Sequence, residues 1–421
     1  MTRAPSEKIA YAALVTIVTA IVALQRIAIP AGGSQISVVL PIVLLALAAL
    51  LVTGALVEDR YRASAYLLAF GLCLAAALGS SLAGEEGSLL SILLLGVLYA
   101  PFVYVVRPEL RRLYPRVVDF FCRLMLVGAF LSIGMWAAQM LGWRYHDLLA
   151  VLPPGWLLED YNTSYPVRAE SEIFKSNGII FLEPSFCSQF LALALIAQLE
   201  LGGKRWRLPI YVAGILTTVA GTGLLLITFG LIVLAVRRGP FWTGGMFLVT
   251  VLVAATVAAT PVGELLSSRA GETQDESSSF NLRFTDPYER AYDAIGENDS
   301  APFVGRGPGF VNRETDVHFE LTGLNLAFST PTKLFAEYGL IAGAAFLAFI
   351  FIVFLSKVPS LTIAAATLFL HLTLSGSLLQ PFTVYLGLVF ASMFAVPAAV
   401  PALRRAGAVP RMARTPARPQ P

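Results

Sequence analysis

Long apolar runs are the feature that most constrains this chain. They fall near residues 9–29, 36–57, 63–83, 88–106, 117–142, 183–201, 208–236, 240–261, 334–356, 359–377 and 381–400. Charged residues make up only 14% of the chain, against about a quarter in soluble domains. Because several runs are long enough to cross a bilayer, we predict an all-α integral membrane protein with about 11–12 transmembrane helices. Residues 1–400 are expected to form one transmembrane domain.

Short basic segments between the runs predict the topology. They are EDRYR (58–62), RPELRRLYPR (107–116), GGKRWR (202–207) and RR (237–238). The positive-inside rule places all of them in the cytoplasm if the run 208–236 is a hairpin of two short helices. Gly221 and Gly223 in TTVAGTGLL tolerate such a break, and a single crossing there is the alternative. Residues 401–421 are expected to be a disordered cytoplasmic basic tail.

Two long segments then lie on the outer side, at about 143–182 and 262–333. The second carries twelve Asp/Glu and five Arg but no lysine before Lys333. Arginine grips carboxylates and phosphates through two contacts, whereas lysine acts as a point charge. The bias indicates anion binding, although a soluble cap held by internal ion pairs is by itself the commoner explanation.

A polar cluster opens the apolar run that begins at Glu183. A carboxylate followed by proline suits the first turn of a helix, so a helix-capping glutamate is the simplest explanation. Polar groups at a membrane boundary are nevertheless candidates for function. The neighbours of this glutamate that enter the candidate site are Ser185, Gln189, Arg168 and Lys175.

Two further polar segments follow in the second long segment. In FNLRFTDPYERAYDAIGENDSAPFVGRGPGF (280–310), Arg283 and Arg290 share one face if the stretch is a helix. GRGPGF (305–310) is expected to be a turn or an exposed loop, whose glycines let backbone amides approach a ligand. STPTKLFAEYGL (329–340) predicts a helix start, with Lys333 and Glu337 one turn apart.

In this order the segments resemble the O-antigen ligase and O-antigen polymerase-like family of bacterial membrane proteins. The elements that carry the resemblance are KSNGIIFLEPS, TTVAGTG, RFTDPYERAYDAIGENDSAPFVGRGPG and KLFAEYGL. The resemblance implies a glycosyltransferase that polymerises undecaprenyl-diphosphate-linked oligosaccharide repeat units into O-antigen or exopolysaccharide. The reaction would take place at the outer face of the bacterial inner membrane, with the active site facing the periplasm and undecaprenyl diphosphate released.

The resemblance also implies roles for particular residues. Arg283 matches the loop arginine that holds the diphosphate, and Glu183 matches the carboxylate of the Glu-Pro-Ser element, so these two are the expected catalytic residues. Lys175 stands where many relatives have arginine. The residues expected to bind substrate are Arg168, Lys175, Ser185, Gln189, Arg290, Arg306, His318, Lys333 and Glu337. Guanidiniums would stabilise the departing diphosphate, and a base would activate the attacking hydroxyl.

Two alternatives stay open at this stage. The first is an O-antigen ligase that transfers the glycan to another acceptor. Ligase relatives often carry a histidine shortly before the Glu-x-Gly glutamate, and FSTPTKLFAE has none, which favours a polymerase; His318 is a substitute, although a lone loop histidine is more often solvated. The second alternative is a transporter or flippase of lipid-linked sugars, which the largely uncharged helix centres disfavour.

The implied partners are a lipid-linked glycan donor, a glycan acceptor and membrane lipid, with room for a chain-length regulator and no nucleic acid. No cofactor is expected. No metal is expected either, because the carboxylates and histidines show no recognisable ligand spacing. His371, inside an apolar run, is expected to be a packed core residue.

Overall fold

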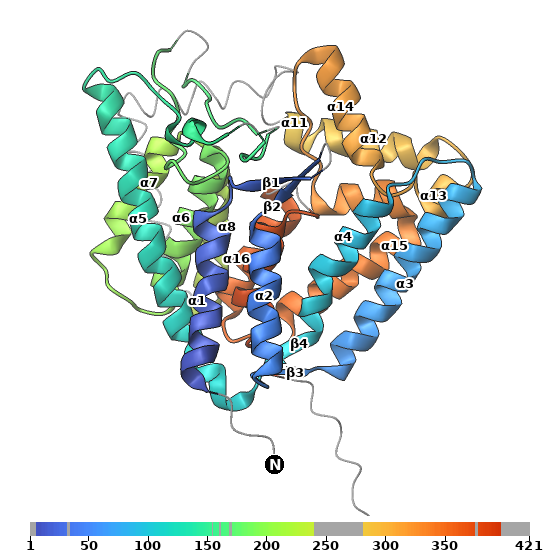
Figure 1. Ribbon diagram of the computed structural model, residues 1–421, viewed down its shortest axis with the longest axis horizontal. Coiled ribbons are helices and arrows are strands. Elements are labelled where there is room, and N and C mark those ends of the chain that lie inside the picture. The colour runs from blue at the N-terminus through green and yellow to red at the C-terminus, as the bar shows by residue number, and fades with distance from the viewer. Residues whose placement is uncertain are drawn as a thin grey trace, which may run out of the picture.

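Helices predominate in the computed structural model of the protein (Figure 1). The structure describes residues 6–31, 34–153, 155–159, 161–167, 171–239, 281–374 and 378–396. Within these ranges, four helical segments are long and apolar enough to cross a membrane: Arg60–Leu82, Pro108–Met140, Gly221–Arg238 and Thr330–Leu355. The all-α prediction is confirmed, and the number of crossings stays a prediction. The predicted helix at 240–261 and the tail 401–421 lie outside the described residues.

The first part of the chain alternates helices with two short β-ribbons. Its elements are α1 (Glu7–Ala23), β1 (Ala28–Ala31), β2 (Ser34–Ser37), α2 (Val39–Val52), β3 (Leu56–Glu58), α3 (Arg60–Leu82), α4 (Leu89–Tyr99), η1 (Ala100–Val103), β4 (Tyr104–Val106), η2 (Pro108–Leu113) and α5 (Tyr114–Met140). Strands β1 and β2 pair antiparallel with Ile29 opposite Ile36, and β3 pairs with β4. The two ribbons tie helix ends together at opposite ends of the bundle (Figure 1).

The second part of the chain contains the most buried helix and the loops of the candidate site. Its elements are η3 (Leu148–Val151), α6 (Pro184–Glu200), α7 (Arg207–Thr218), α8 (Gly221–Arg238), α11 (Asn281–Phe284), α12 (Asp286–Gly296), α13 (Ala301–Val304), α14 (Phe310–Thr322), α15 (Thr330–Leu355), α16 (Leu361–Phe369), η5 (Leu370–Leu374), α17 (Pro381–Gly387) and η6 (Leu388–Ser392). Helix α6 is buried from Pro184 to Gln198 on every face. Such a helix belongs at the centre of a bundle, because no face of it suits water.

The run 208–236 is broken into two helices. Val219 ends α7 in the left-handed region with φ 47°, and α8 begins at Gly221. The break therefore falls just before the glycines that were expected to make it. Gly223 serves packing instead, because a Cβ there would lie 1.8 Å from the Ser188 hydroxyl of α6.

Contacts with α6 show that α7 and α8 run in opposite directions. At one end of α6, Arg207 at the start of α7 donates to Gln198, and Arg237 at the end of α8 donates to Glu200. At the other end of α6, the Ser188 hydroxyl donates to the Ala220 carbonyl just before α8. The predicted hairpin is therefore present.

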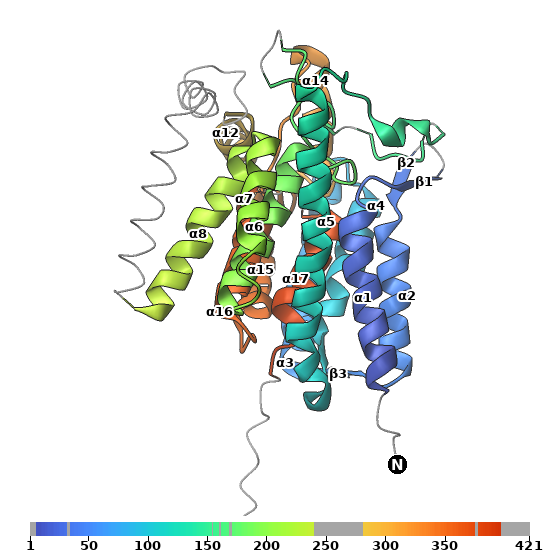
Figure 2. The same cartoon turned by 90° about the vertical axis from the view of Figure 1, so that its left-hand side faces the viewer.

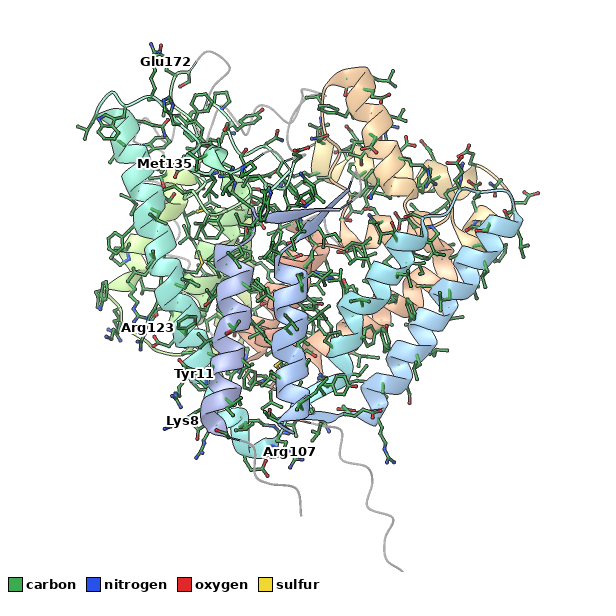
Figure 3. The ribbon with its side chains drawn as sticks, viewed as in Figure 1. Lys8, Tyr11, Arg107, Arg123, Met135 and Glu172 are labelled. Atoms are coloured by element: carbon green, nitrogen blue, oxygen red, sulfur yellow. The ribbon has the colours of Figure 1, made fainter. Side chains whose placement is uncertain are left out.

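The connecting segments gather at opposite ends of the bundle (Figures 1 and 2). We call one end the loop end; it carries the described parts of 143–182 and 281–329. The other, which we call the basic end, carries β3, β4 and the segment around Arg107. Lys8 also lies at the basic end, far from Glu172 at the loop end (Figure 3).

The last two helices form a broken hairpin. Helix α16 continues into the π-helical turn η5, and α17 continues into the π-helical turn η6. At the start of α16 the Ser360 hydroxyl donates to Glu200, and at the end of η6 Ser392 accepts from Arg62. Turn η5 ends at Leu374 and α17 begins at Pro381, at the loop-end side of α6. Single π-helical turns are frequent at functional sites.

Candidate functional site

Glu183 and Arg283 meet at the loop end, 100 residues apart in sequence. The Arg283 Nη2 donates to the Glu183 Oε2 over 3.2 Å. Glu183 stands just before α6 in an extended conformation, and its side chain caps none of the helix amides. The simple capping explanation is therefore wrong, because the carboxylate turns toward the arginine of α11. The two side chains are 13% and 25% exposed, so the pair is sheltered but reachable.

Neutral donors hold the Glu183 carboxylate from two further sides. The Ser185 hydroxyl donates to Oε2 over 2.8 Å, and the Asn162 backbone N–H donates to Oε1 over 3.2 Å. Ser185 thus contacts Glu183, and its role toward a substrate stays a prediction. Nothing in the sequence pointed to Asn162, because it contacts Glu183 through its backbone N–H.

Arg283 also brings the start of α15 to the site. Next to it, the Leu282 carbonyl accepts from the Ala327 N–H over 3.0 Å. Two residues later Ser329 caps α15, accepting from the Thr332 N–H as predicted. The N-terminal ends of α6 and α15 therefore both lie close to Arg283. Helix N-termini carry partial positive charge and bind anions, so the arrangement suits a phosphate-bearing ligand.

A strained turn leads into Glu183 from KSNG. Gly178 and Ile179 both have positive φ, 60° and 68°. A β-branched residue in this region is strained and is held there by its surroundings. The Asn177 side chain accepts from the Ile179 N–H over 2.9 Å, and Arg26 donates to the Ile179 carbonyl over 3.0 Å.

The sequence did not indicate that Arg26 belongs to the site. Besides the Ile179 carbonyl, its guanidinium binds both carboxylate oxygens of Asp147 in the 143–182 segment. The hydrogen bond from Arg26 lowers the pKa of Asp147, so this carboxylate is charged at neutral pH. The available signal was a lone arginine at the end of the first apolar run.

Lys175 lies upstream of the strained turn and is buried. Its ammonium sits 3.9 Å from the centre of the Tyr165 ring, in cation–π geometry. The turn therefore places Lys175 on the same loop as Glu183, but its contact with substrate stays a prediction. Arg168, the other basic residue predicted in this segment, lies outside the described residues.

Gln189 lies one turn into α6, on the face that carries Ser185. It is fully buried, and its Nε2 donates to the Leu374 carbonyl over 3.3 Å. Leu374 ends η5, so Gln189 contacts the last residue of that π-helical turn. Just before α17 the Gln380 Nε2 donates to the Tyr161 hydroxyl over 2.8 Å.

Arg290 does not share a helix with Arg283, which corrects the expectation that both lie on one face. Helix α11 ends at Phe284 and α12 begins at Asp286, because Pro287 suits the first turn of a new helix and lacks the N–H that a continuous helix needs. Arg290 instead donates to Glu314 over 2.5 Å and contacts the His318 Nδ1 over 3.2 Å. The three residues join α12 to α14.

GRGPG is a turn, one of the two expected possibilities, but it packs against protein and is not an exposed loop. Gly305, Gly307 and Gly309 are buried, with φ between 70° and 84°. A Cβ on Gly305 would lie 2.5 Å from the Glu337 backbone, so this glycine allows close approach to α15, whereas Gly307 and Gly309 approach Glu86 and Ser88. Arg306 pairs with Glu85 over 2.9 Å and with Glu297.

Lys333 and Glu337 form the predicted pair one turn apart, with 3.6 Å between Nζ and Oε1. Lys333 also donates to the Asn312 side chain over 2.8 Å. Glu337 is fully buried and accepts from the Val311 N–H at the start of α14. The pair therefore ties α14 to α15, and its role toward a substrate stays a prediction.

His371 is a packed core residue, as predicted, and contacts the Tyr99 hydroxyl over 2.9 Å. Within the described part of the chain, no three His, Cys, Asp or Glu side chains are placed to share a metal ion.

Fold and site together define a helical protein of membrane type, with an arginine–carboxylate pair where two helices begin. No family model, no curated protein and no solved structure matches this chain. The function is therefore argued from the geometry of the site and from the sequence motifs.

Proposed function

We propose that the protein is a bacterial inner-membrane glycosyltransferase that polymerises undecaprenyl-diphosphate-linked repeat units at the periplasmic face. The contact between Glu183 and Arg283 carries the proposal. It joins the Glu-Pro-Ser element to the arginine of the large loop, the two elements to which the resemblance assigns catalysis. The positive-inside rule supports the orientation, because Lys8 and Arg107 lie at the end opposite the site (Figure 3).

Arg283 is suited to hold the diphosphate of the donor. Its hydrogen bond to Glu183 engages only Nη2, so Nε and Nη1 are available for phosphate oxygens. Arginine binds phosphate through paired, charge-assisted hydrogen bonds. The N-termini of α6 and α15 add favourable potential at the same place. The leaving diphosphate gains charge as its bond to the sugar breaks, and these groups would stabilise that charge.

Glu183 is suited to act as the base. Arg283 forms an ion pair with its carboxylate, and a bound diphosphate would compete for that arginine. Ser185 and Asn162 would then hold the carboxylate in position. The acceptor hydroxyl oxygen bonds to C1 of the donor sugar, and its proton passes to Glu183. The bond from C1 to the diphosphate oxygen breaks, and undecaprenyl diphosphate leaves with the electron pair.

The test is transfer by the purified protein. Given a single undecaprenyl-diphosphate-linked repeat unit, the wild type should produce a ladder of longer lipid-linked glycans and release undecaprenyl diphosphate. Arg283→Ala should lower the rate about 100-fold or more, the usual effect of removing one group that stabilises transition-state charge. Arg313→Ala is the matched control, because Arg313 lies in the same loop and its guanidinium contacts Glu86.

Other outcomes lead to other assignments. A full ladder from Arg283→Ala would remove Arg283 from the mechanism. Transfer of one glycan to a different acceptor without a ladder would assign a ligase. Movement of intact lipid-linked sugar across vesicle membranes without any transfer would assign a transporter.

A further inference from the structure

A buried hydrogen-bond acceptor on Gln189 has no donor among the described residues. Gln189 is 0% exposed. Its Nε2 donates to the Leu374 carbonyl. Because a carbonyl only accepts, this contact fixes which end of the amide faces Leu374. The Oε1 is left buried and unpaired.

Gln380 also has one end of its amide hydrogen-bonded and the other end unpaired among the described residues. It stands just before α17 in an extended conformation and donates to the Tyr161 hydroxyl over 2.8 Å. Its Oε1 is also buried without a donor in the described part of the protein. Each glutamine therefore has one end held by the protein and an acceptor left over.

Aromatic contacts place the two glutamines on the same interface. Phe186 and Phe190, which flank Gln189 on α6, both contact the Phe382 ring, with ring centres 5.2 Å and 6.4 Å apart. Phe382 follows Gln380 by two residues, and the Gln380 partner Tyr161 packs edge-on to Phe186.

This interface lies directly beneath the catalytic pair. Ser185, which donates to Glu183, is one helical turn above Gln189. Tyr161, which binds Gln380, precedes the Asn162 whose N–H donates to Glu183. Gln189 therefore belongs to a segment that also holds Glu183, and Gln380 contacts another such segment.

The chemistry of the unpaired atoms selects the ligand. A buried acceptor without a donor is costly, and it is expected where a ligand supplies the missing donor. Two amide oxygens call for O–H or N–H donors. Phosphate oxygens carry none at neutral pH, and an isoprenoid chain has none. Sugar hydroxyls supply them in number.

We propose that Gln189 and Gln380 form a sugar-hydroxyl subsite that recognises the sugar joined to the diphosphate of the donor. This inference rests on the proposed function and deepens it. The two glutamines are specificity-determining residues, whereas Glu183 and Arg283 perform the transfer.

The test measures the contribution of the sugar alone. Binding of undecaprenyl diphosphate to purified protein is compared with binding of the same lipid bearing one glucose, galactose or N-acetylglucosamine. The wild type should bind at least one sugar-bearing lipid more tightly than the bare lipid. Gln189→Met and Gln380→Met should each reduce that preference by about 3–10-fold, the usual worth of one hydrogen bond. Binding of the bare lipid should not change.

Thermal unfolding separates recognition from support of the fold. Each methionine variant removes the unpaired acceptor and also the Nε2 hydrogen bond, to the Leu374 carbonyl or to the Tyr161 hydroxyl. Its unfolding midpoint without ligand should therefore fall by no more than the loss of one hydrogen bond explains. Gln198→Met is the control at the basic end, because the Gln198 Oε1 accepts from Arg207 and its loss should lower the midpoint.

Three results would overturn the subsite. An unchanged sugar preference in both variants would reject it while leaving the proposed function standing. Equal weakening for bare and sugar-bearing lipid, with an unfolding midpoint lowered by more than one hydrogen bond explains, would show a purely structural role. No binding of any lipid by the wild type would reject the proposed function and the subsite together.

Discussion

At the scale of single residues, the partners of Glu183 give opposite expectations for binding and turnover. Glu183→Gln keeps a group that can accept from Ser185 but removes the base and the charge that holds Arg283. Turnover should fall by about 100-fold or more. Binding of undecaprenyl diphosphate should tighten, because Arg283 no longer gives up an ion pair to reach it. Single-turnover rates and lipid binding on the same preparation measure both effects.

Glu86→Gln is the control for that change, since Glu86 lies at the loop end and its side chain is 88% exposed. It should leave both quantities unchanged. Weaker lipid binding by Glu183→Gln would contradict the exchange of Arg283 between carboxylate and diphosphate.

The sequence predicted both residues of the central contact, Glu183 and Arg283, but not the residues that hold them in place. Glu183 and Arg283 were predicted together through the order of motifs, and they are in contact. Arg26 escaped notice because its partners, Asp147 and the Ile179 carbonyl, are distant in sequence and carry no motif. Spacing cannot reveal which carboxylate an arginine will meet across a fold.

At the scale of elements, the GRGPG turn determines how the loop-end helices sit on α15. Gly305 has φ 70° and ψ −171°, a region that essentially only glycine adopts. Gly305→Ala adds strain there and drives a Cβ into the Glu337 backbone. We expect it to destabilise the protein by about 2–4 kcal/mol, seen as a lower unfolding midpoint in detergent.

Gly296→Ala offers a matched comparison at the end of α12. A Cβ there meets nothing within 4 Å, so the change should be neutral or slightly stabilising through helix propensity. Equal stability of the Gly305 and Gly296 variants would mean that the turn is not seated against α15.

Helix starts were predictable from local signals, whereas the seating of the turn was not. The starts at Pro184 and Ser329 follow from proline and capping chemistry, and both are found. The burial of GRGPG depends on the non-helical backbone of α15 at Gly339, which the sequence of the turn itself does not indicate. A glycine-rich loop looks the same in sequence whether it approaches a ligand or another backbone.

At the scale of the whole molecule, the hairpin of α7 and α8 predicts that Arg205 and Gly239 lie on one side of the membrane. In a background lacking Cys73, Cys122 and Cys187, single cysteines at these positions should react with a membrane-impermeant thiol reagent only after permeabilisation. A cysteine replacing His146 at the loop end should react in intact cells. Opposite accessibility at residues 205 and 239 would mean an odd number of crossings in that region.

Composition was enough to predict a helical bundle of membrane type, because a soluble fold could not bury this much apolar surface away from water. The segregation of basic segments from the loop end was also predictable from their spacing. The packing order of the helices was not, because apolar runs of similar composition are interchangeable until particular residues such as Ser188 and Gly223 fit together.

The interruption of α15 at Gly339 reverses the usual rule for improving a helix. Gly339 has φ 73° and ψ 179°, and the Ala336 carbonyl near it accepts from the Arg306 N–H over 2.8 Å. An alanine would raise the helical propensity of this segment, yet its Cβ would lie 2.6 Å from the Phe303 backbone. Replacing this glycine would give a more regular helix that no longer accommodates the backbone of α13. The irregular backbone at Gly339 is therefore what allows α13 to pack closely against α15.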